Sequence, residues 1–136
     1  APLTPMTNGL LAIYYGKPYE KATEHVDSKL YNVFKREGIA GLKNTYQQMV
    51  SEGNTPRERS LNYFGYELMQ MDELGAAITV FELNNQSYPE SANTFDSLGE
   101  AYLAAGDKQK ALASYKSALK LNPDSESAKQ AIEKLQ

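Results

Sequence analysis

The residues that could carry catalysis in this sequence are few. It contains no cysteine and a single histidine, His25, so thiolate nucleophiles, cysteine-ligated metals and histidine-containing triads each lack an essential part. Ser117 and Lys120 have the S-x-x-K spacing of a nucleophilic serine with a lysine one helical turn away, but the S-D-N and K-T-G elements of that chemistry are missing. We therefore predict no catalytic, cofactor-binding or metal-binding residue. Ser117 and Lys120 are interpreted as part of a solvated helix face, and His25 as structural or solvent-exposed.

Two acidic residues, Asp96 and Glu100, lie one turn apart on a predicted helix. Like charges at this spacing repel one another mildly on an exposed helix, so helix stability does not explain the pair.

Composition and charge exclude several classes of partner. The 136 residues suit one globular domain, with 41% hydrophobic and 23% charged residues. The net charge is −3, the pI is about 5.2, and no run of Lys or Arg suggests a nucleic-acid surface. The longest apolar run, Gly9 to Gly16, is too short to span a bilayer. The sequence thus predicts neither nucleic-acid binding nor membrane insertion.

The elements that must position the acidic pair repeat along the chain. When the sequence is shifted against itself so that Gly65 falls on Gly99, large residues match large ones and proline matches proline. This shift is 34 positions (99 − 65), and we call it the period. Each period holds two amphipathic helical patterns joined by a turn, and a proline stops the second helix. Thr55 to Glu58 has the sequence of a capping box, which predicts a helix start. Asp124 or Ser125 is expected to cap the helix after the last proline.

Gly65 and Gly99 stand in the middle of the first helix of each period. Glycine in a helix interior costs about 1 kcal/mol relative to alanine, so we expect a compensating gain. We predict that the second helix crosses close to each glycine, with Ala77 and Ala111 opposite. The residues expected to pack the repeats are Leu61, Phe64, Gly65, Leu68, Ala77, Phe81, Pro89, Phe95, Leu98, Gly99, Tyr102, Ala111, Tyr115, Ala118 and Pro123.

These patterns divide the chain into five segments. Residues 1–27 hold a short apolar helix and a linker, 28–57 a degenerate helical hairpin around Gly38, 58–91 and 92–125 two clear repeats, and 126–136 a capping helix. A helix at this end would cover the open face of the last hairpin. The chain is thus predicted to be a short stack of helical pairs.

A helix–turn–helix period of this length resembles the tetratricopeptide repeat. The residues that carry the resemblance are Phe95, Leu98, Gly99, Tyr102, Gly106, Ala111, Tyr115, Ala118 and Pro123. The resemblance implies an all-α, right-handed solenoid of helical hairpins, with two clear repeats, one degenerate N-terminal hairpin and a C-terminal capping helix. The first repeat departs from the pattern at Asp72 and Asn84, which predicts a looser turn and a looser helix crossing there.

In tetratricopeptide-repeat proteins, the first helices of the repeats line a concave surface that binds partners. The resemblance places eight side chains on that surface: Asn62, Tyr66, Met69, Gln70, Asn93, Asp96, Glu100 and Leu103. Two acids, a tyrosine and amides favour a basic or polar peptide segment. The family's clamp for C-terminal carboxylates needs Lys, Arg and Asn, and only the Asn part is present. A solvated groove without any ligand is the alternative.

A larger resemblance covers nearly the whole chain. The stretches "GLLAIYYGKPYEK" and "SYPESANTFDSLGEAYLAAGDKQKAL" look like the C-terminal extension of bacterial serine hydrolases of the beta-lactamase and penicillin-binding-protein-like group. The resemblance implies that residues 1–27 are the end of a catalytic domain, and that the protein is periplasmic or secreted. Three tyrosines of this segment are candidates for an exposed or interdomain patch: Tyr14, Tyr15 and Tyr19.

Three hypotheses follow for function. The first is a noncatalytic module that binds a protein or peptide segment, or its own upstream catalytic domain, as the accessory domain of a serine hydrolase. The second is a homo-oligomerisation module that pairs through the N-terminal helix or an uncovered hairpin face, giving a homodimer. The third is a regulatory domain that docks over the active site of its own hydrolase.

Overall fold

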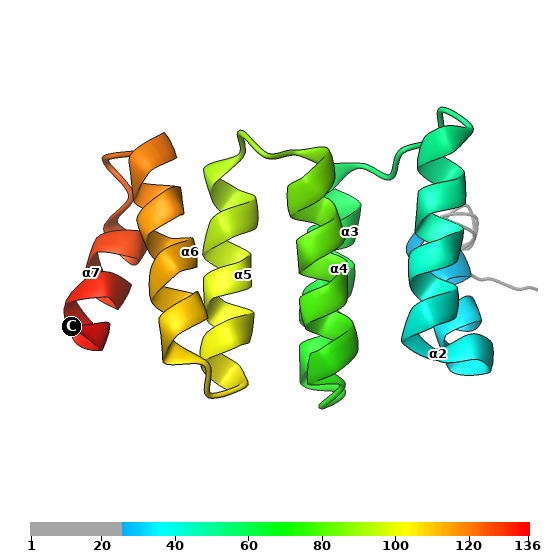
Figure 1. Ribbon diagram of the computed structural model, residues 1–136, viewed down its shortest axis with the longest axis horizontal. Helices are drawn as coiled ribbons and strands as arrows, with labels where there is room; N and C mark the ends of the chain where they lie inside the picture. The colour runs from blue at the N-terminus through cyan, green and yellow to red at the C-terminus, as the bar shows by residue number, and fades with distance from the viewer. Residues whose placement is uncertain (1–25) are drawn as a thin grey trace, which may run out of the picture.

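A computed structural model describes residues 26–136, and in this part of the chain it contains six helices and no strand. They are α2 (Val26–Ser51), α3 (Glu58–Gln70), α4 (Leu74–Ser87), α5 (Ala92–Ala104), α6 (Lys108–Leu121) and α7 (Glu126–Leu135). Figure 1 shows them in one elongated row, from α2 at one end to α7 at the other. The predicted all-α hairpin solenoid is confirmed. The predicted helix within residues 1–27, its three tyrosines and His25 lie outside the described residues.

The helix bounds follow the predicted period. Both ends of α5 lie one period after the ends of α3, and both ends of α6 lie one period after those of α4. The helix α7 also starts one period after α5 and therefore occupies the place of a further first helix. Its N-cap is Ser125, whose hydroxyl accepts a hydrogen bond from the Ala128 amide at 3.2 Å. The predicted cap at this position is confirmed.

The close crossing at the two mid-helix glycines is also confirmed. A Cβ added to Gly65 would lie 2.4 Å from a ring carbon of Phe81, and one added to Gly99 would lie 2.8 Å from the ring of Tyr115. Carbon atoms do not approach this closely without strain, so each glycine makes room for an aromatic ring of the following helix. These rings, rather than the predicted alanines, are the nearest neighbours of the glycines.

Most of the predicted packing residues lie inside the molecule. Phe95 and Tyr102 are half-buried, whereas Pro89 and Pro123 are exposed in the loops that end α4 and α6. Those two prolines therefore act by stopping helices and not by packing, which corrects their assignment as packing residues. The buried members of the set are Leu61, Phe64, Gly65, Leu68, Ala77, Phe81, Leu98, Gly99, Ala111, Tyr115 and Ala118.

The prediction of a looser turn at Asp72 is wrong. Asp72 adopts a left-handed backbone with φ of 63°, as Gly106 does with φ of 85° one period later. The amides of Asp72 and Glu73 bond the carbonyls of Met69 and Leu68 at 3.0 and 2.9 Å, and the equivalent bonds around Gly106 have the same lengths. Both ends are Schellman motifs, in which such paired bonds satisfy the last helical carbonyls. The aspartate thus adopts the glycine turn despite its Cβ.

The sequence predicted a looser crossing of α3 and α4 at Asn84, but the structure shows this residue tying the two helices together. Its side chain is fully buried, and its Nδ2 donates to the backbone carbonyl of Glu58 at 3.0 Å. The bond ties the C-terminal part of α4 to the start of α3. The side-chain Oδ1 of Asn84 is buried and has no partner within the described part of the chain.

The predicted capping box at Thr55 to Glu58 is not formed. The N-cap residue of α3 is Arg57, and no side chain caps it. Pro56 lies before the helix and is buried, and its carbonyl accepts a hydrogen bond from the Tyr88 hydroxyl at 2.6 Å. The chain before α3 is therefore held by a tertiary contact with the end of α4 instead of a local cap.

The segment before the two repeats packs on the first of them, against α3 and α4, as a further pair of helical pieces. α2 is interrupted at Gly38, whose φ of 76° and ψ of −166° suit glycine alone. Gly38 lies one period before Asp72, so the break keeps the repeat spacing. Leu30 and Leu42, one on each side of the break, are buried in the same core as α3 and α4. The Tyr46 hydroxyl from α2 donates to the Leu83 carbonyl of α4 at 3.1 Å.

The helix α7 covers α6 at the other end of the row (Figure 1). Ala128 is fully buried in a cluster with Tyr115, and Ile132 and Leu135 pack against that cluster. The residue one period after Gly99 is Glu133, which is exposed. α7 therefore carries an exposed charged residue at the position that a buried glycine holds in α3 and α5.

Candidate functional site

A hydrogen-bonded network joins the first helices of the two repeats. The Ser97 hydroxyl of α5 donates to the Asn62 Oδ1 of α3 at 2.6 Å, and the Tyr66 hydroxyl of α3 lies 3.1 Å from the same serine oxygen. Tyr66 also donates to a carboxylate oxygen of Glu100. The structure thus brings together three of the side chains that the resemblance placed on one surface, Asn62, Tyr66 and Glu100.

Asp96 extends this network to α7. Its Oδ2 accepts a hydrogen bond from the Ser127 hydroxyl at 3.1 Å, while its Oδ1 is buried without a partner among the described residues. The two acids of α5 therefore contact opposite neighbours, Glu100 towards α3 and Asp96 towards α7. We call the surface formed along these three helices the first-helix face; its residues are Asn62, Tyr66, Asn93, Asp96, Glu100, Leu103 and Ser127.

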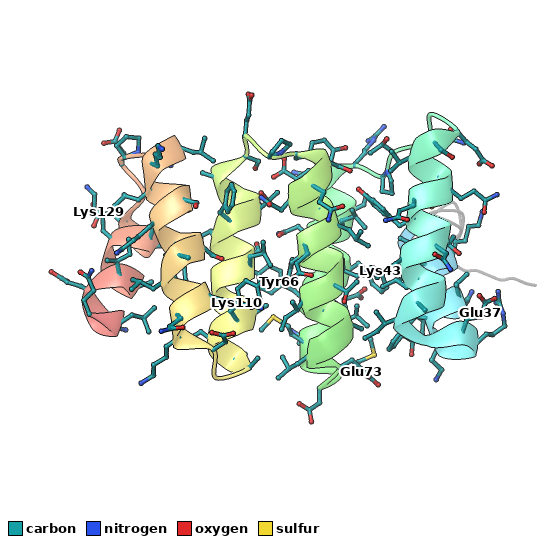
Figure 2. The ribbon with its side chains drawn as sticks, viewed as in Figure 1. Glu37, Lys43, Tyr66, Glu73, Lys110 and Lys129 are labelled. Carbon is teal, nitrogen blue, oxygen red and sulfur yellow. The ribbon has the colours of Figure 1, made fainter. Side chains whose placement is uncertain are left out.

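The remaining predicted side chains differ in how far they reach solvent. Asn93 and Gln70 are exposed and make no side-chain hydrogen bond within residues 26–136. Leu103 is 40% exposed and is one of six large apolar residues that reach solvent in the described part of the chain. Met69 is half-buried and packs against the core, so it supports the network more than it faces solvent. Figure 2 shows Tyr66 near the middle of the row of helices.

The carboxylates of this face take part in no ion pair within the described part of the chain. The ion pairs recorded across residues 26–136 join Arg36 to Glu37 and Lys129 to Glu126, so neither Asp96 nor Glu100 takes part in one. Their field acts on a neighbouring tyrosine. Burial raises the pKa of the Tyr115 hydroxyl to about 12, with further contributions from Glu100 and Asp96. Negative charge near a phenol disfavours the phenolate.

Tyr66 experiences the same two carboxylates from a closer position. Burial raises the pKa of its hydroxyl well above the usual range, and the hydrogen bond to Glu100 raises that pKa further. Tyr66 therefore stays a neutral donor to Glu100 around neutral pH and well above it. Its ring packs edge-on against Phe81, with centroids 5.1 Å apart, which holds the hydroxyl in place.

Sequence reasoning missed the two serines that complete the network. Ser97 is only 2% exposed and Ser127 is exposed at the start of α7. Neither has a residue of the same type one period away that would have marked it. The only signal in the sequence is that Ser97, a small polar residue, directly follows Asp96 and interrupts an otherwise apolar stripe.

The serine and lysine with S-x-x-K spacing lie outside the first-helix face. Ser117 lies late in α6, where it is half-buried, and Lys120 is exposed near the end of the same helix. Within residues 26–136 there is no group of three or more His, Cys, Asp or Glu side chains that could hold a metal ion. No helix in that range is long and apolar enough to cross a membrane.

Comparison with known families agrees with the helical architecture. The family model of the tetratricopeptide repeat matches residues 92–125, which comprise α5, its turn, α6 and the loop before α7. No curated protein matches the chain. Tetratricopeptide repeats suggest protein partners. Residues 92–125 are therefore a tetratricopeptide repeat, set within an all-α array of helical hairpins.

Proposed function

We propose that this chain is a noncatalytic interaction module whose first-helix face binds a segment of another protein. The observation that carries the proposal is the network across α3, α5 and α7, in which Tyr66–Glu100 and Asp96–Ser127 bonds join separate helices into one polar face. Exposed Asn93 and Leu103 on the same face have no internal role that explains them. A rigid face with free polar and apolar groups suits the recognition of a partner.

A site-specific photo-crosslinker tests the proposal. It would replace Asn93, which is exposed on the first-helix face, and in a matched variant Lys116, which is exposed on α6 away from that face. Both variants would be irradiated in extracts of cells that contain the protein. We expect discrete crosslinked products from position 93 and none from position 116. Equal labelling from both positions, or none from position 93, would remove the first-helix face as the binding surface.

The finer proposal is that the module serves a bacterial serine hydrolase of the beta-lactamase-like class, in the periplasm or outside the cell. The support is the resemblance carried by residues 9–21 and 87–112. In that setting the module contacts its own catalytic domain or docks over the active site. The coding sequence upstream of Ala1 tests the parentage, since an S-x-x-K-bearing domain is expected there. Turnover of the hydrolase with and without the module tests the docking, because unchanged kinetics would contradict regulation.

Self-association is the alternative use of the same scaffold. The large apolar residues exposed within residues 26–136 are spread over several elements: Ile39, Val50, Tyr63, Met71, Leu103 and Leu121. Dimer interfaces usually need a contiguous apolar patch, so a peptide segment fits the described surface better than a second copy. Sedimentation at high concentration distinguishes peptide binding from self-association, because a dimer would favour self-association.

A further inference from the structure

The hydrogen bonds of the first-helix face have a direction, and that direction leaves specific groups free. The Ser97 hydroxyl donates to the Asn62 Oδ1, so the acceptor of the amide is occupied. The two N–H bonds of the Asn62 side chain have no partner among the described residues. Because an asparagine side chain offers one acceptor group and one donor group, this face presents Asn62 as a donor.

Glu100 offers the complementary group. One of its carboxylate oxygens accepts the hydrogen bond from Tyr66, and the side chain as a whole is exposed. No cation of the described residues pairs with it or with Asp96 one turn earlier. A partner that brought further negative charge against these two carboxylates would lose the hydration of both without compensation, which is costly. A partner cation would instead be attracted to Glu100.

We infer that the occupant of the first-helix face is an extended peptide segment that carries lysine or arginine, an inference that rests on the proposed function. The amide of Asn62 donates to a main-chain carbonyl of the segment, and the carboxylate of Glu100 accepts the basic side chain. Ser97 holds the Asn62 amide, Tyr66 holds the Glu100 carboxylate, and the two hydroxyl oxygens lie 3.1 Å apart, so the relative positions of the two groups are set before binding. Preorganised groups bind with a smaller entropy loss.

The inference assigns different roles to the two residues, and a phage-displayed library of random dodecapeptides separates them. The library would be selected on the whole chain, and the enriched peptides would be measured by fluorescence anisotropy. We expect enrichment in lysine and arginine. Glu100→Gln keeps an acceptor for Tyr66 but removes the charge, and should weaken only the basic peptides, by about tenfold. Asn62→Ala should weaken basic and neutral peptides alike.

The matched control is Glu82→Gln. Glu82 accepts a hydrogen bond from Tyr102 at 2.6 Å, as Glu100 does from Tyr66, but it lies on α4, outside the first-helix face. This control should leave affinity unchanged, and thermal melting of each variant confirms that it is folded. Amide shifts in NMR titrations locate the bound peptides.

Each outcome decides between the inference and the proposed function. Peptides that shift α3 and α5 amides but are not enriched in Lys or Arg, or that bind Glu100→Gln as well as the parent chain, would refute the inference and leave the proposed function intact. Equal losses in Glu82→Gln and Glu100→Gln would also refute it. A library that yields no binder, or binders that shift only amides elsewhere, would refute both.

Discussion

Replacing Gly65 by alanine sets two opposing effects against each other, and the structure decides the sign. Alanine improves helix propensity by about 1 kcal/mol. The new Cβ, however, would stand 2.4, 2.5 and 2.8 Å from three ring atoms of Phe81, a side chain that is only 1% exposed. Relief requires a shift of roughly 1 Å, since carbon atoms pack at about 3.5–4.0 Å. Overpacking of this kind costs about 1–3 kcal/mol. The cost approaches the upper end of this range when the ring is enclosed, as the Phe81 ring is.

We therefore expect Gly65→Ala to lower the free energy of unfolding by about 1–2 kcal/mol. The assay is urea denaturation followed by circular dichroism at the helical band. The control is Gly75→Ala in α4, where the new Cβ would meet only the Ile39 Cδ1 at an ordinary 3.5 Å and the propensity gain should remain. If Gly65→Ala is as stable as the parent chain, the close approach of the ring is not what this glycine serves.

A double variant isolates the contact itself. Phe81→Leu removes the ring atoms that face Gly65, so adding Gly65→Ala to it should cost much less than it does in the parent chain. The coupling free energy of the two substitutions should be about 1 kcal/mol or more. Additive effects would show that the alanine acts somewhere other than at Phe81.

Three further outcomes are expected. Asp72→Gly should raise the free energy of unfolding by about 0.5–1 kcal/mol in the same assay, because it relieves the left-handed backbone at φ of 63°; a loss of stability would contradict this. Asn84→Asp should destabilise the fold by about 3 kcal/mol at neutral pH, because it places a carboxyl at a fully buried site and removes the donor to Glu58; a midpoint like that of the parent would count against the buried bond. Above pH 10 the fold should weaken: the pKa of Tyr115 is about 12 in the folded chain and 10.0 when unfolded, so its stabilising contribution is complete below pH 10 and is lost as the pH rises towards 12. At pH 11 the loss from this group is about 1 kcal/mol, and Tyr115→Phe should flatten the alkaline limb of the stability profile.

The period, the helices and the glycine crossings were determined by the sequence itself. Amphipathic patterns at i, i+3 and i+4 are local, and the single shift that places Gly65 on Gly99 aligned both hairpins. The stop at Pro123 predicted a cap at Asp124 or Ser125, and the structure has it at Ser125. The costly glycine at Gly99 pointed to a close approach because helix propensity is a property of the residue and needs no partner to be known. The eight side chains proposed for the partner surface came from the resemblance, and binding to them remains a prediction.

Only the tertiary structure decided which groups meet across helices. Asp72 adopts a glycine turn because two backbone hydrogen bonds hold it there, and Asn84 finds the Glu58 carbonyl because α3 and α4 cross at that point. The same holds for the bonds of Ser97 with Asn62 and of Ser127 with Asp96. A helical pattern specifies which stripe is buried, but a hydrogen bond needs two atoms within about 3 Å. That distance depends on the rotation and offset of neighbouring helices, which no local pattern contains.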